Sequence, residues 1–252
     1  MKKKFQLLLT FAILFTMAFA PPKKMKIYLV GDSTIANKEV KAYPETGWGM
    51  PFRYFFDSTV DVDNRAKNGR STKSFIGEGL WQPVLDKLQE GDYVFIQFGH
   101  NDEGKEKTGR YTTPDEFKTN LTRYVNESRS KKAIPVLITP VARRTFDDNG
   151  QVKESHPVYS DAVREVAKQL NVPLIDLDEK SKILLQQFGP ENSKLLFNYT
   201  APGEHPNYPD GHKDDTHFSE LGARKMAEIV LGEIKNILPD LSKRIYNPAV
   251  KK

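Results

Sequence analysis

The stretch Ile27-Tyr28-Leu29-Val30-Gly31-Asp32-Ser33-Thr34 joins a short apolar run to a small polar turn. An apolar run of this length is typical of a strand that is buried on both faces of a parallel sheet. Four later segments are also short and rich in apolar, β-branched or aromatic residues. With the first strand at residues 26–30, they predict strands at residues 60–64, 93–98, 134–139 and 173–176.

Helical patterns separate these strands. Residues 114–129 follow a capping box made by Thr113 and Glu116, and their apolar side chains recur on one face. Residues 158–170 and 220–238 also repeat apolar side chains at helical spacing. Strands that alternate with helices predict an α/β fold, a doubly wound three-layer α/β/α sandwich. For five parallel strands we expect the order 2-1-3-4-5.

Two segments interrupt the alternation. Residues 142–155 contain Asp148-Asn149-Gly150, which indicates a tight turn and favours a small hairpin. Residues 190–216 are rich in Pro, Gly, Tyr and Asn without a regular period, so we expect a long functional loop there. We expect one domain over residues 24–240 and a surface tail over residues 241–252.

The N-terminal residues have the pattern of a secretory leader. Three lysines at positions 2–4 precede an apolar run over residues 5–19, which ends in Ala18-Phe19-Ala20. This pattern predicts a signal peptide at residues 1–20 and export to the periplasm or the outside. The run is too short for a membrane span, so we expect no membrane insertion after the leader is removed.

Composition excludes several classes of protein. Without the leader the chain has 35 Lys and Arg against 33 Asp and Glu, and no basic block, so nucleic-acid binding is disfavoured. The chain has no cysteine, which excludes disulfides, thiolate metal sites and thiol nucleophiles. The protein must therefore hold its fold together by packing alone.

Four polar blocks follow the predicted strands. In chain order, the blocks are Gly31-Asp32-Ser33-Thr34, Asn68-Gly69-Arg70-Ser71, Gly99-His100-Asn101-Asp102 and Asp214-Asp215-Thr216-His217. The first and third come directly after strands, the second follows its strand within a short loop, and the fourth lies in the long loop after the last strand. Because the carboxyl ends of parallel strands meet at one edge of a sheet, we expect the blocks to converge there.

The residue types in these blocks suit nucleophilic catalysis of ester hydrolysis. Ser33 is the candidate nucleophile, although a serine at this place can instead cap a helix. His217 is the candidate general base, and Asp214 is the candidate acid that orients it from a turn or an early helix. Asp215 is a second candidate for the orienting acid. Alternatively, Asp215 caps the helix that follows.

The same blocks offer donors for an oxyanion. The backbone N–H groups of Ser33 and Gly69 and the side-chain amide of Asn101 are the candidates, although the last two are also common turn residues. The histidines and acids between residues 205 and 217 allow a metal site, but they lack the H-E-x-x-H spacing of a zincin helix. We therefore favour a mechanism without a metal or another cofactor.

The four blocks resemble those of the SGNH (GDSL-like) hydrolases. Ser33, Gly69, Asn101 and His217 occupy the four lettered positions, and Asp214 is the acid of the D-x-x-H block. The resemblance runs from about residue 26 to about residue 238. It implies a flavodoxin-like α/β/α fold and a serine esterase mechanism through an acyl-enzyme.

Three further features resemble rhamnogalacturonan acetylesterases in particular. They are Thr34, the string Phe98-Gly99-His100-Asn101-Asp102 and the string Thr139-Pro140-Val141-Ala142-Arg143-Arg144. The narrower resemblance implies removal of O-acetyl groups from a pectic polysaccharide. The first alternative is an SGNH esterase that acts on another acetylated glycan, such as xylan or peptidoglycan, or on a lipid ester. The second alternative is a non-catalytic polysaccharide-binding protein.

Several residues near the predicted site are candidates for substrate contact. Trp48 offers a face for sugar stacking, unless it belongs to the core. Arg70, Arg143 and Arg144 suit the carboxylates of galacturonate, which arginine binds bidentately, unless they are solvated loop residues. His100 is either a packing residue or a substrate contact. We expect a monomer whose partner is an acetylated polysaccharide or oligosaccharide.

Overall fold

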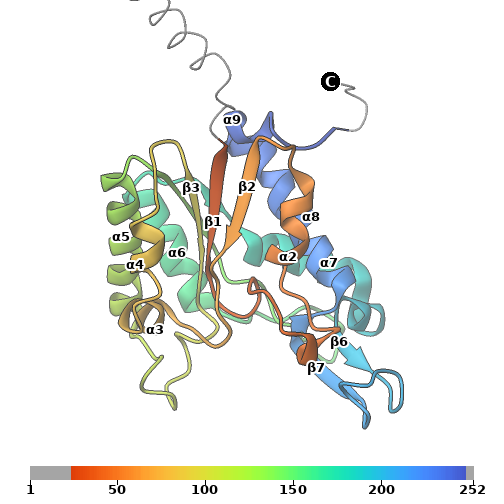
Figure 1. Cartoon of the computed structure of the whole chain (residues 1–252). Helices are drawn as coiled ribbons and strands as arrows, with labels where there is room; N and C mark the ends of the chain where they lie inside the picture. The colour runs from red at the N-terminus through yellow and green to blue at the C-terminus, as the bar shows by residue number, and fades with distance from the viewer. Residues whose placement is uncertain (1–23, 248–252) are drawn as a thin grey trace, which may run out of the picture.

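The computed structural model describes residues 24–247, which build a parallel sheet with the strand order β2-β1-β3-β4-β5 (Figure 1). The strands are β1 (Met25–Gly31), β2 (Val60–Asn64), β3 (Tyr93–Gln97), β4 (Ile134–Ile138) and β5 (Leu174–Ile175). The predicted fold class and strand order are confirmed. The predicted signal peptide lies outside the described residues. Among the described helices, none has both the length and the apolar composition that a membrane span requires.

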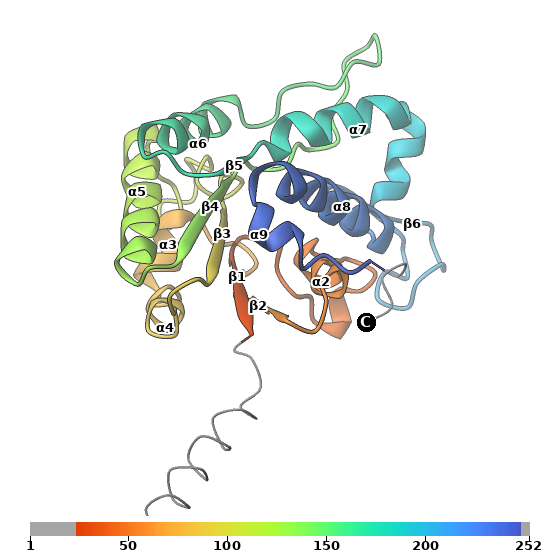
Figure 2. The same ribbon diagram turned by 90° about the horizontal axis from the view of Figure 1, so that it is seen from above.

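Helices cover both faces of the sheet (Figure 2). One layer holds α3 (Thr72–Gly77), α4 (Gln82–Leu85), α5 (Pro114–Ser130) and α6 (Pro157–Gln169). The other holds α2 (Gly49–Phe52), α7 (Leu177–Asn192), α8 (Glu220–Ile237) and α9 (Pro239–Ser242).

Neighbouring residues of β1 belong to two separate cores. Ile27 and Leu29 pack with the layer of α2, α7, α8 and α9, whereas Tyr28 and Val30 pack with the layer of α3 to α6. All four side chains are fully buried. This burial on both faces explains why the first strand reads as a continuous apolar run.

Most boundaries of the helices and strands agree with the local signals in the sequence. The three predicted helices form as α5, α6 and α8, and the capping box joins Thr113 and Glu116 in both directions. The small hairpin after β4 is confirmed by an antiparallel bridge between Phe146 and Val152. β5 is shorter than predicted because Asp176 leaves the strand to cap α7, where its side chain accepts a hydrogen bond from the backbone of Glu179.

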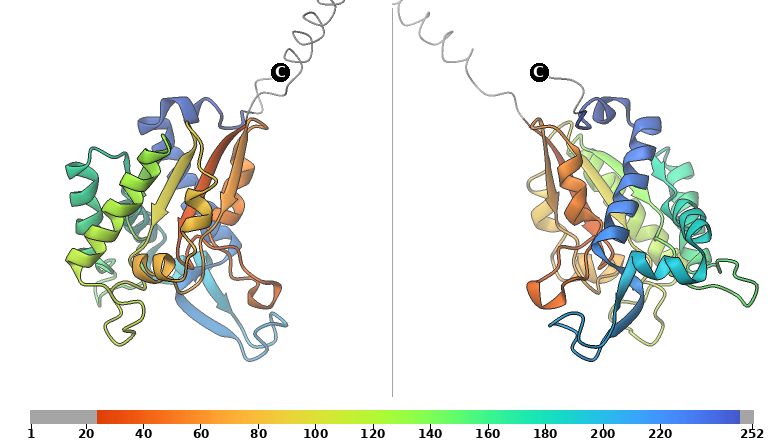
Figure 3. Two further views of the ribbon diagram at one scale, coloured as in Figure 1. Left: turned by 60° about the vertical axis from the view of Figure 1, so that its left-hand side comes forward. Right: turned by 90° about the vertical axis from the view of Figure 1, so that its right-hand side faces the viewer.

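The prediction of an irregular loop over residues 190–216 is wrong. This segment contains the 3-10 helix η3 (Ser193–Leu196), strand β6 (Phe197–Thr200) and most of strand β7 (His212–Phe218). β6 and β7 pair as an antiparallel ribbon, which Figure 3 shows beyond the carboxyl ends of the sheet strands. Apart from Pro190, the proline and glycine residues that suggested a loop lie in the connection between the two strands.

The helix α7 is missed in the sequence, although Asp176 followed by Glu179 is a helix-start signal. Its geometry breaks at Gly189, where φ is 71°, and Pro190 follows directly inside the element. A glycine and a proline together normally mark the end of a helix, so they hide the fact that the chain continues in helical form on both sides.

The predicted surface tail begins later than residue 241. Leu241 is fully buried in the core, and Ile245 forms a β-bridge with Phe56. The backbone N–H of Tyr246 donates to the carbonyl of Phe55 at 2.8 Å. The prediction is therefore wrong for residues 241–246, because the apolar side chains of Leu241 and Ile245 pack against the core.

Gly222 fixes the distance between α8 and η3. A Cβ at this position would overlap the backbone carbonyl of Leu196, the last residue before β6. We expect Gly222→Ala to push η3 away from α8 and to lower the free energy of unfolding by about 2 kcal/mol or more, because the obstacle is backbone. Urea unfolding measures the change.

Gly232→Ala is the matched control in the same helix. A Cβ there meets nothing within 4 Å, so the substitution should stabilise the protein by up to about 1 kcal/mol through helix propensity. Equal unfolding midpoints for the two variants would contradict the close packing of α8 on η3.

Candidate active site

Ser33 lies two residues beyond β1 in a turn that Asp32 closes. The Asp32 carboxylate accepts hydrogen bonds from the backbone N–H of Thr34 at 2.9 Å and from its hydroxyl at 2.8 Å. This Asx turn is a local property of the sequence. Gly31 permits it where β1 touches β3, because a Cβ at Gly31 would overlap the carbonyl oxygen of Gln97. The turn holds Ser33 at the carboxyl edge of the sheet.

Asp214 and His217 come from a bulge in β7. The strand pairs with β6 on either side of residues 214–217, which stand opposite a single residue of β6. Asp214 Oδ1 closes the bulge by accepting from the backbone N–H of Thr216 at 2.7 Å and of His217 at 3.0 Å. The expected turn therefore forms inside a strand, and it brings side chains three positions apart to the same side.

The structure brings the predicted nucleophile, base and acid into one line. His217 Nε2 lies 2.9 Å from Ser33 Oγ, and His217 Nδ1 lies 2.7 Å from Asp214 Oδ2. A histidine whose Nδ1–H is held by a carboxylate keeps Nε2 free to accept the serine proton. Burial alone would raise the pKa of Asp214, but the hydrogen bonds and charge of His217 outweigh it and hold that pKa well below its usual range.

Gly69 and Asn101 lie on the loops that follow β2 and β3. Gly69 has φ +74°, a conformation that glycine adopts without strain. Asn101 Nδ2 donates to the carbonyl of Arg70 at 3.1 Å, which leaves its second N–H available. The backbone N–H groups of Ser33 and Gly69 donate none of the backbone hydrogen bonds found in residues 24–247. The three predicted donors therefore have N–H groups available, and their service to an oxyanion at Ser33 stays a prediction.

Lys38 ties the Ser33 turn to the loop of Gly69, and no sequence pattern identifies it. Its Nζ donates to the carbonyl of Ser33 at 2.5 Å and to Asn68 Oδ1 at 3.0 Å, and it pairs with Glu45 at 2.6 Å. The side chain is fully buried. Burial lowers the pKa of Lys38, and the charge of Glu45 opposes that shift. A single lysine in a polar stretch gives no signal of this role, because only the fold surrounds it with acceptors.

His100 is largely buried, and it also lines a cavity of about 350 Å³ that Asn101 lines, so its contact with a substrate stays a prediction. Its Nδ1 lies 3.5 Å from Asp32 Oδ2, and its ring centroid lies 4.2 Å from that of His156. His156 in turn lies 2.8 Å from Glu103 Oε2. Burial and the neighbouring His156 lower the pKa of His100 to about 4, so its ring is neutral at neutral pH. The row of side chains supports the Ser33 turn from within.

Trp48 is fully buried, so its prediction as a stacking platform is wrong. Its Nε1 donates to Gln97 Oε1 at 2.9 Å, and Gln97 Nε2 donates to Thr34 Oγ1 at 2.7 Å. The ring packs edge-on against Phe52 at a centroid distance of 5.3 Å. Trp48 thus supports the residue beside Ser33 from the core.

Arg144 anchors β7, which corrects its prediction as a substrate contact. Its backbone N–H and its guanidinium bind the carbonyl and the carboxylate of Asp215 at 2.9 and 2.5 Å. The guanidinium also donates to Pro190 at 2.6 Å and lies over the ring of Tyr199 at 5.3 Å. Asp215 is therefore a support of the bulge, and the cap of α8 is Ser219 instead.

Arg143 remains partly open to solvent. Its guanidinium donates to Thr216 Oγ1 and lies 3.6 Å from Glu103 Oε1, and its side chain is 34% exposed. It lines a cavity of about 350 Å³ together with Asn101. Contact of Arg143 with a substrate stays a prediction.

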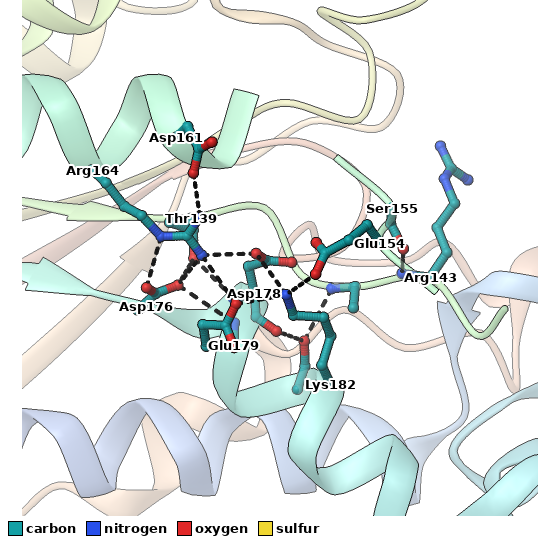
Figure 4. A network of polar contacts seen from close by, with 12 residues as sticks. Thr139, Arg143, Glu154, Ser155, Asp161, Arg164, Asp176, Asp178, Glu179 and Lys182 are labelled. Atoms are coloured by element: carbon teal, nitrogen blue, oxygen red, sulfur yellow. Dashed lines mark hydrogen bonds and ion pairs between the residues drawn. The ribbon is translucent and has the colours of Figure 1, made fainter. Parts of the chain in front are cut away.

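A polar network fixes the loop that carries both arginines (Figure 4). Arg164 of α6 forms ion pairs with carboxylates at the start of α7, and Lys182 of α7 binds Glu154 at 2.7 Å. The neighbouring Ser155 accepts a hydrogen bond from the backbone N–H of Arg143 at 2.9 Å. Two helices therefore hold the base of the loop that supports β7.

Arg70 lies at the edge of the site. Its guanidinium binds Glu78 at 2.7 and 2.9 Å, and it lines a cavity of about 560 Å³ with Lys67 and Asn68. Contact of Arg70 with a substrate also stays a prediction. Within residues 24–247, no group of three or more His, Asp or Glu side chains is placed to hold a metal ion.

Ser33 contacts His217, and His217 contacts Asp214, at the carboxyl edge of a doubly wound sheet. This arrangement defines a serine hydrolase of the α/β/α class. Residues 29–225 match the GDSL-like Lipase/Acylhydrolase family, and the chain belongs to this family. The resemblance of the four sequence blocks to SGNH (GDSL-like) hydrolases is thereby confirmed.

Relatives from Bacillus subtilis (strain 168) are similar to most of the chain. The rhamnogalacturonan acetylesterase RhgT is 44% identical over 215 residues, which cover 85% of this chain and 91% of RhgT. The probable rhamnogalacturonan acetylesterase YesY is 38% identical over 216 residues, which cover 84% of this chain and 93% of YesY. The crystal structure of YxiM from Bacillus subtilis has a TM-score of 0.73 at 26% identity, covering 86% of this chain and 57% of that chain.

The two neighbouring acids of the bulge have different roles and offer a matched pair of variants. Asp214→Asn should lower kcat for 4-nitrophenyl acetate by about 10³-fold or more, because the histidine loses the carboxylate that fixes its tautomer. Asp215→Asn should keep kcat within about tenfold of the wild type and mainly lower stability, because it loses the ion pair with Arg144. The reverse order of kcat values would make Asp215 the orienting acid.

Proposed function

We propose that this chain is a rhamnogalacturonan acetylesterase, a carboxylic ester hydrolase that removes O-acetyl groups from a pectic polysaccharide. The observation that carries the proposal is the contact from Ser33 through His217 to Asp214. The similarity to RhgT, 44% over 85% of this chain, supports the substrate class. The geometry of the site supports ester hydrolysis, and the similarity to RhgT supports the glycan substrate.

The first half of the reaction acetylates the enzyme. Ser33 Oγ attacks the acetyl carbonyl while His217 Nε2 takes its proton, and Asp214 stabilises the imidazolium. The backbone N–H groups of Ser33 and Gly69 and the amide of Asn101 receive the oxyanion. His217 then gives the proton to the sugar oxygen, the ester C–O bond breaks, and acetyl-Ser33 remains.

The second half returns the enzyme to its starting state. A water molecule attacks the carbonyl of acetyl-Ser33 and gives its proton to His217. The tetrahedral intermediate collapses, acetate leaves, and the proton on His217 returns to Ser33 Oγ. Each half uses the same base and the same oxyanion donors, so a single site suffices.

The guanidinium of Arg143 is the group beside Asn101 that suits an acidic glycan, and Glu103 lies 3.6 Å from it. Arg143 lines the cavity next to Asn101, and its side chain is 34% exposed. An arginine fork matches a carboxylate bidentately, and pectic backbones carry one on each galacturonate.

We also propose that the protein is exported, because residues 1–20 have the basic start, apolar middle and small-residue end of a signal peptide. N-terminal sequencing of the protein recovered from periplasm or culture medium tests this. A mature N-terminus near residue 21 supports export, and an intact leader on protein confined to the cytoplasm contradicts it.

Ser33→Ala tests the chemistry. It should lower acetate release from both 4-nitrophenyl acetate and acetylated rhamnogalacturonan by at least about 10⁴-fold, because no other group replaces the nucleophile. Circular dichroism and thermal unfolding should match the wild type. Retained activity in the folded variant would overturn the mechanism.

A substrate panel tests the glycan separately. With the wild-type enzyme, kcat/KM for acetate release should be higher on acetylated rhamnogalacturonan than on acetylated xylan or a long-chain ester. A preference for xylan or for the long-chain ester would contradict the proposed substrate and leave the serine mechanism intact.

A further inference from the structure

Arg110 touches both loops that carry the oxyanion donors outside the Ser33 turn. Its Nη1 donates to Asn101 Oδ1 at 3.3 Å. The same Nη1 lies 3.2 Å from the place where a Cβ on Gly69 would be. One guanidinium therefore packs against Gly69 and binds Asn101 at once.

The two hydrogen bonds of the Asn101 side chain fix its orientation. Nδ2 donates to the carbonyl of Arg70 at 3.1 Å, and Oδ1 accepts from Arg110 at 3.3 Å. A rotated amide would set its oxygen against a carbonyl and its NH₂ against a guanidinium, which are two repulsive contacts. Both neighbours thus select the orientation in which the second N–H of Nδ2 is the oxyanion donor.

The loop that carries Arg110 is tied to Asp102, the residue that follows Asn101, by two hydrogen bonds from Thr112. The backbone N–H of Thr112 donates to the carbonyl of Asp102 at 3.0 Å, and its hydroxyl donates to the buried Asp102 carboxylate at 3.1 Å. These bonds hold position 110 at a fixed distance from position 101, although the residues lie on opposite sides of an exposed loop.

The charge of Arg110 is not neutralised by a close acid. Among the residues that the structure describes, no carboxylate forms an ion pair with Arg110, whereas Arg70 pairs with Glu78 and Arg144 pairs with Asp215. Arginine stays protonated at all working pH values, so a positive charge persists beside Asn101. It makes the Asn101 carboxamide a stronger donor, since it polarises the oxygen of the same group.

We propose that Arg110 is a positioning residue of the oxyanion hole, which acts on the transition state through the amide of Asn101. This inference rests on the proposed esterase mechanism. It assigns Arg110 no contact with the ester itself, so the loss of Arg110 should lower kcat and leave KM for a small neutral ester nearly unchanged.

Single variants test the kinetic signature on 4-nitrophenyl acetate. Arg110→Ala should lower kcat by about 10-fold or more with KM within about 2-fold, because the interaction matters in the transition state. Arg110→Lys should fall between Arg110→Ala and the wild type, since an ammonium can still donate to Oδ1. Arg123→Ala is the matched control, an exposed arginine of α5 that pairs with Glu127, and it should leave kcat unchanged.

A double-mutant cycle tests the route through Asn101. Asn101→Ala should lower kcat by about 10²–10³-fold, as loss of one oxyanion donor does. Adding Arg110→Ala to Asn101→Ala should cost less than about 2-fold more, because its target is gone. The inference would be overturned if Arg110→Ala lowered kcat by the same factor with and without Asn101→Ala, or if it left kcat unchanged in both backgrounds. An effect of Arg110→Ala on KM for an acidic glycan alone would also overturn it.

The two proposals fail separately. If Ser33→Ala is inactive and Arg110→Ala has the wild-type kcat, only the role of Arg110 is wrong. If Ser33→Ala retains its activity, the esterase mechanism is wrong and the role of Arg110 falls with it. Thermal unfolding of each variant distinguishes loss of function from loss of fold.

Discussion

The chemistry depends on a 2.9 Å contact between Ser33 Oγ and His217 Nε2, whose residues are 184 positions apart in the chain. A displacement of about 1 Å between reacting groups can cost about 100-fold in rate, so the contact requires two rigid supports. The parallel sheet is the first, because β1 is buried on both faces and ends at the Ser33 turn. The ribbon of β6 and β7 is the second.

The ribbon is not rigid by itself, since isolated two-stranded hairpins are marginally stable in water. Its bulge is closed locally by Asp214 and held from outside by Arg144, whose own loop is tied to α7 by the ion pair of Glu154 with Lys182. On the other side of the site, Lys38 joins the Ser33 turn to the loop of Gly69. Buried or partly buried charges thus set the geometry of the site, together with the core contact from Trp48 through Gln97 to Thr34.

Local signals predict the strands and three long helices, because buried strands and capping boxes are encoded over a few residues. The strand order and the meeting of the site residues at one edge follow from the usual topology of parallel sheets. The supports of the site were not predictable in the same way. Lys38, Arg110 and Arg144 act through contacts that only the folded chain creates, and a polar residue alone does not reveal whether it is buried. The ribbon was hidden by the turn residues of its connection, and Trp48 is a core residue that composition cannot distinguish from a sugar platform.

The central claim is that Ser33 becomes covalently acetylated because His217 activates it. The most direct measurement is peptide mass mapping of the enzyme after an acid quench of turnover with 4-nitrophenyl acetate. We expect one acetyl group, located on Ser33, and none when His217 is replaced by alanine. Acetylation at another residue, or rapid turnover with no acetyl group trapped on Ser33, would contradict the claim.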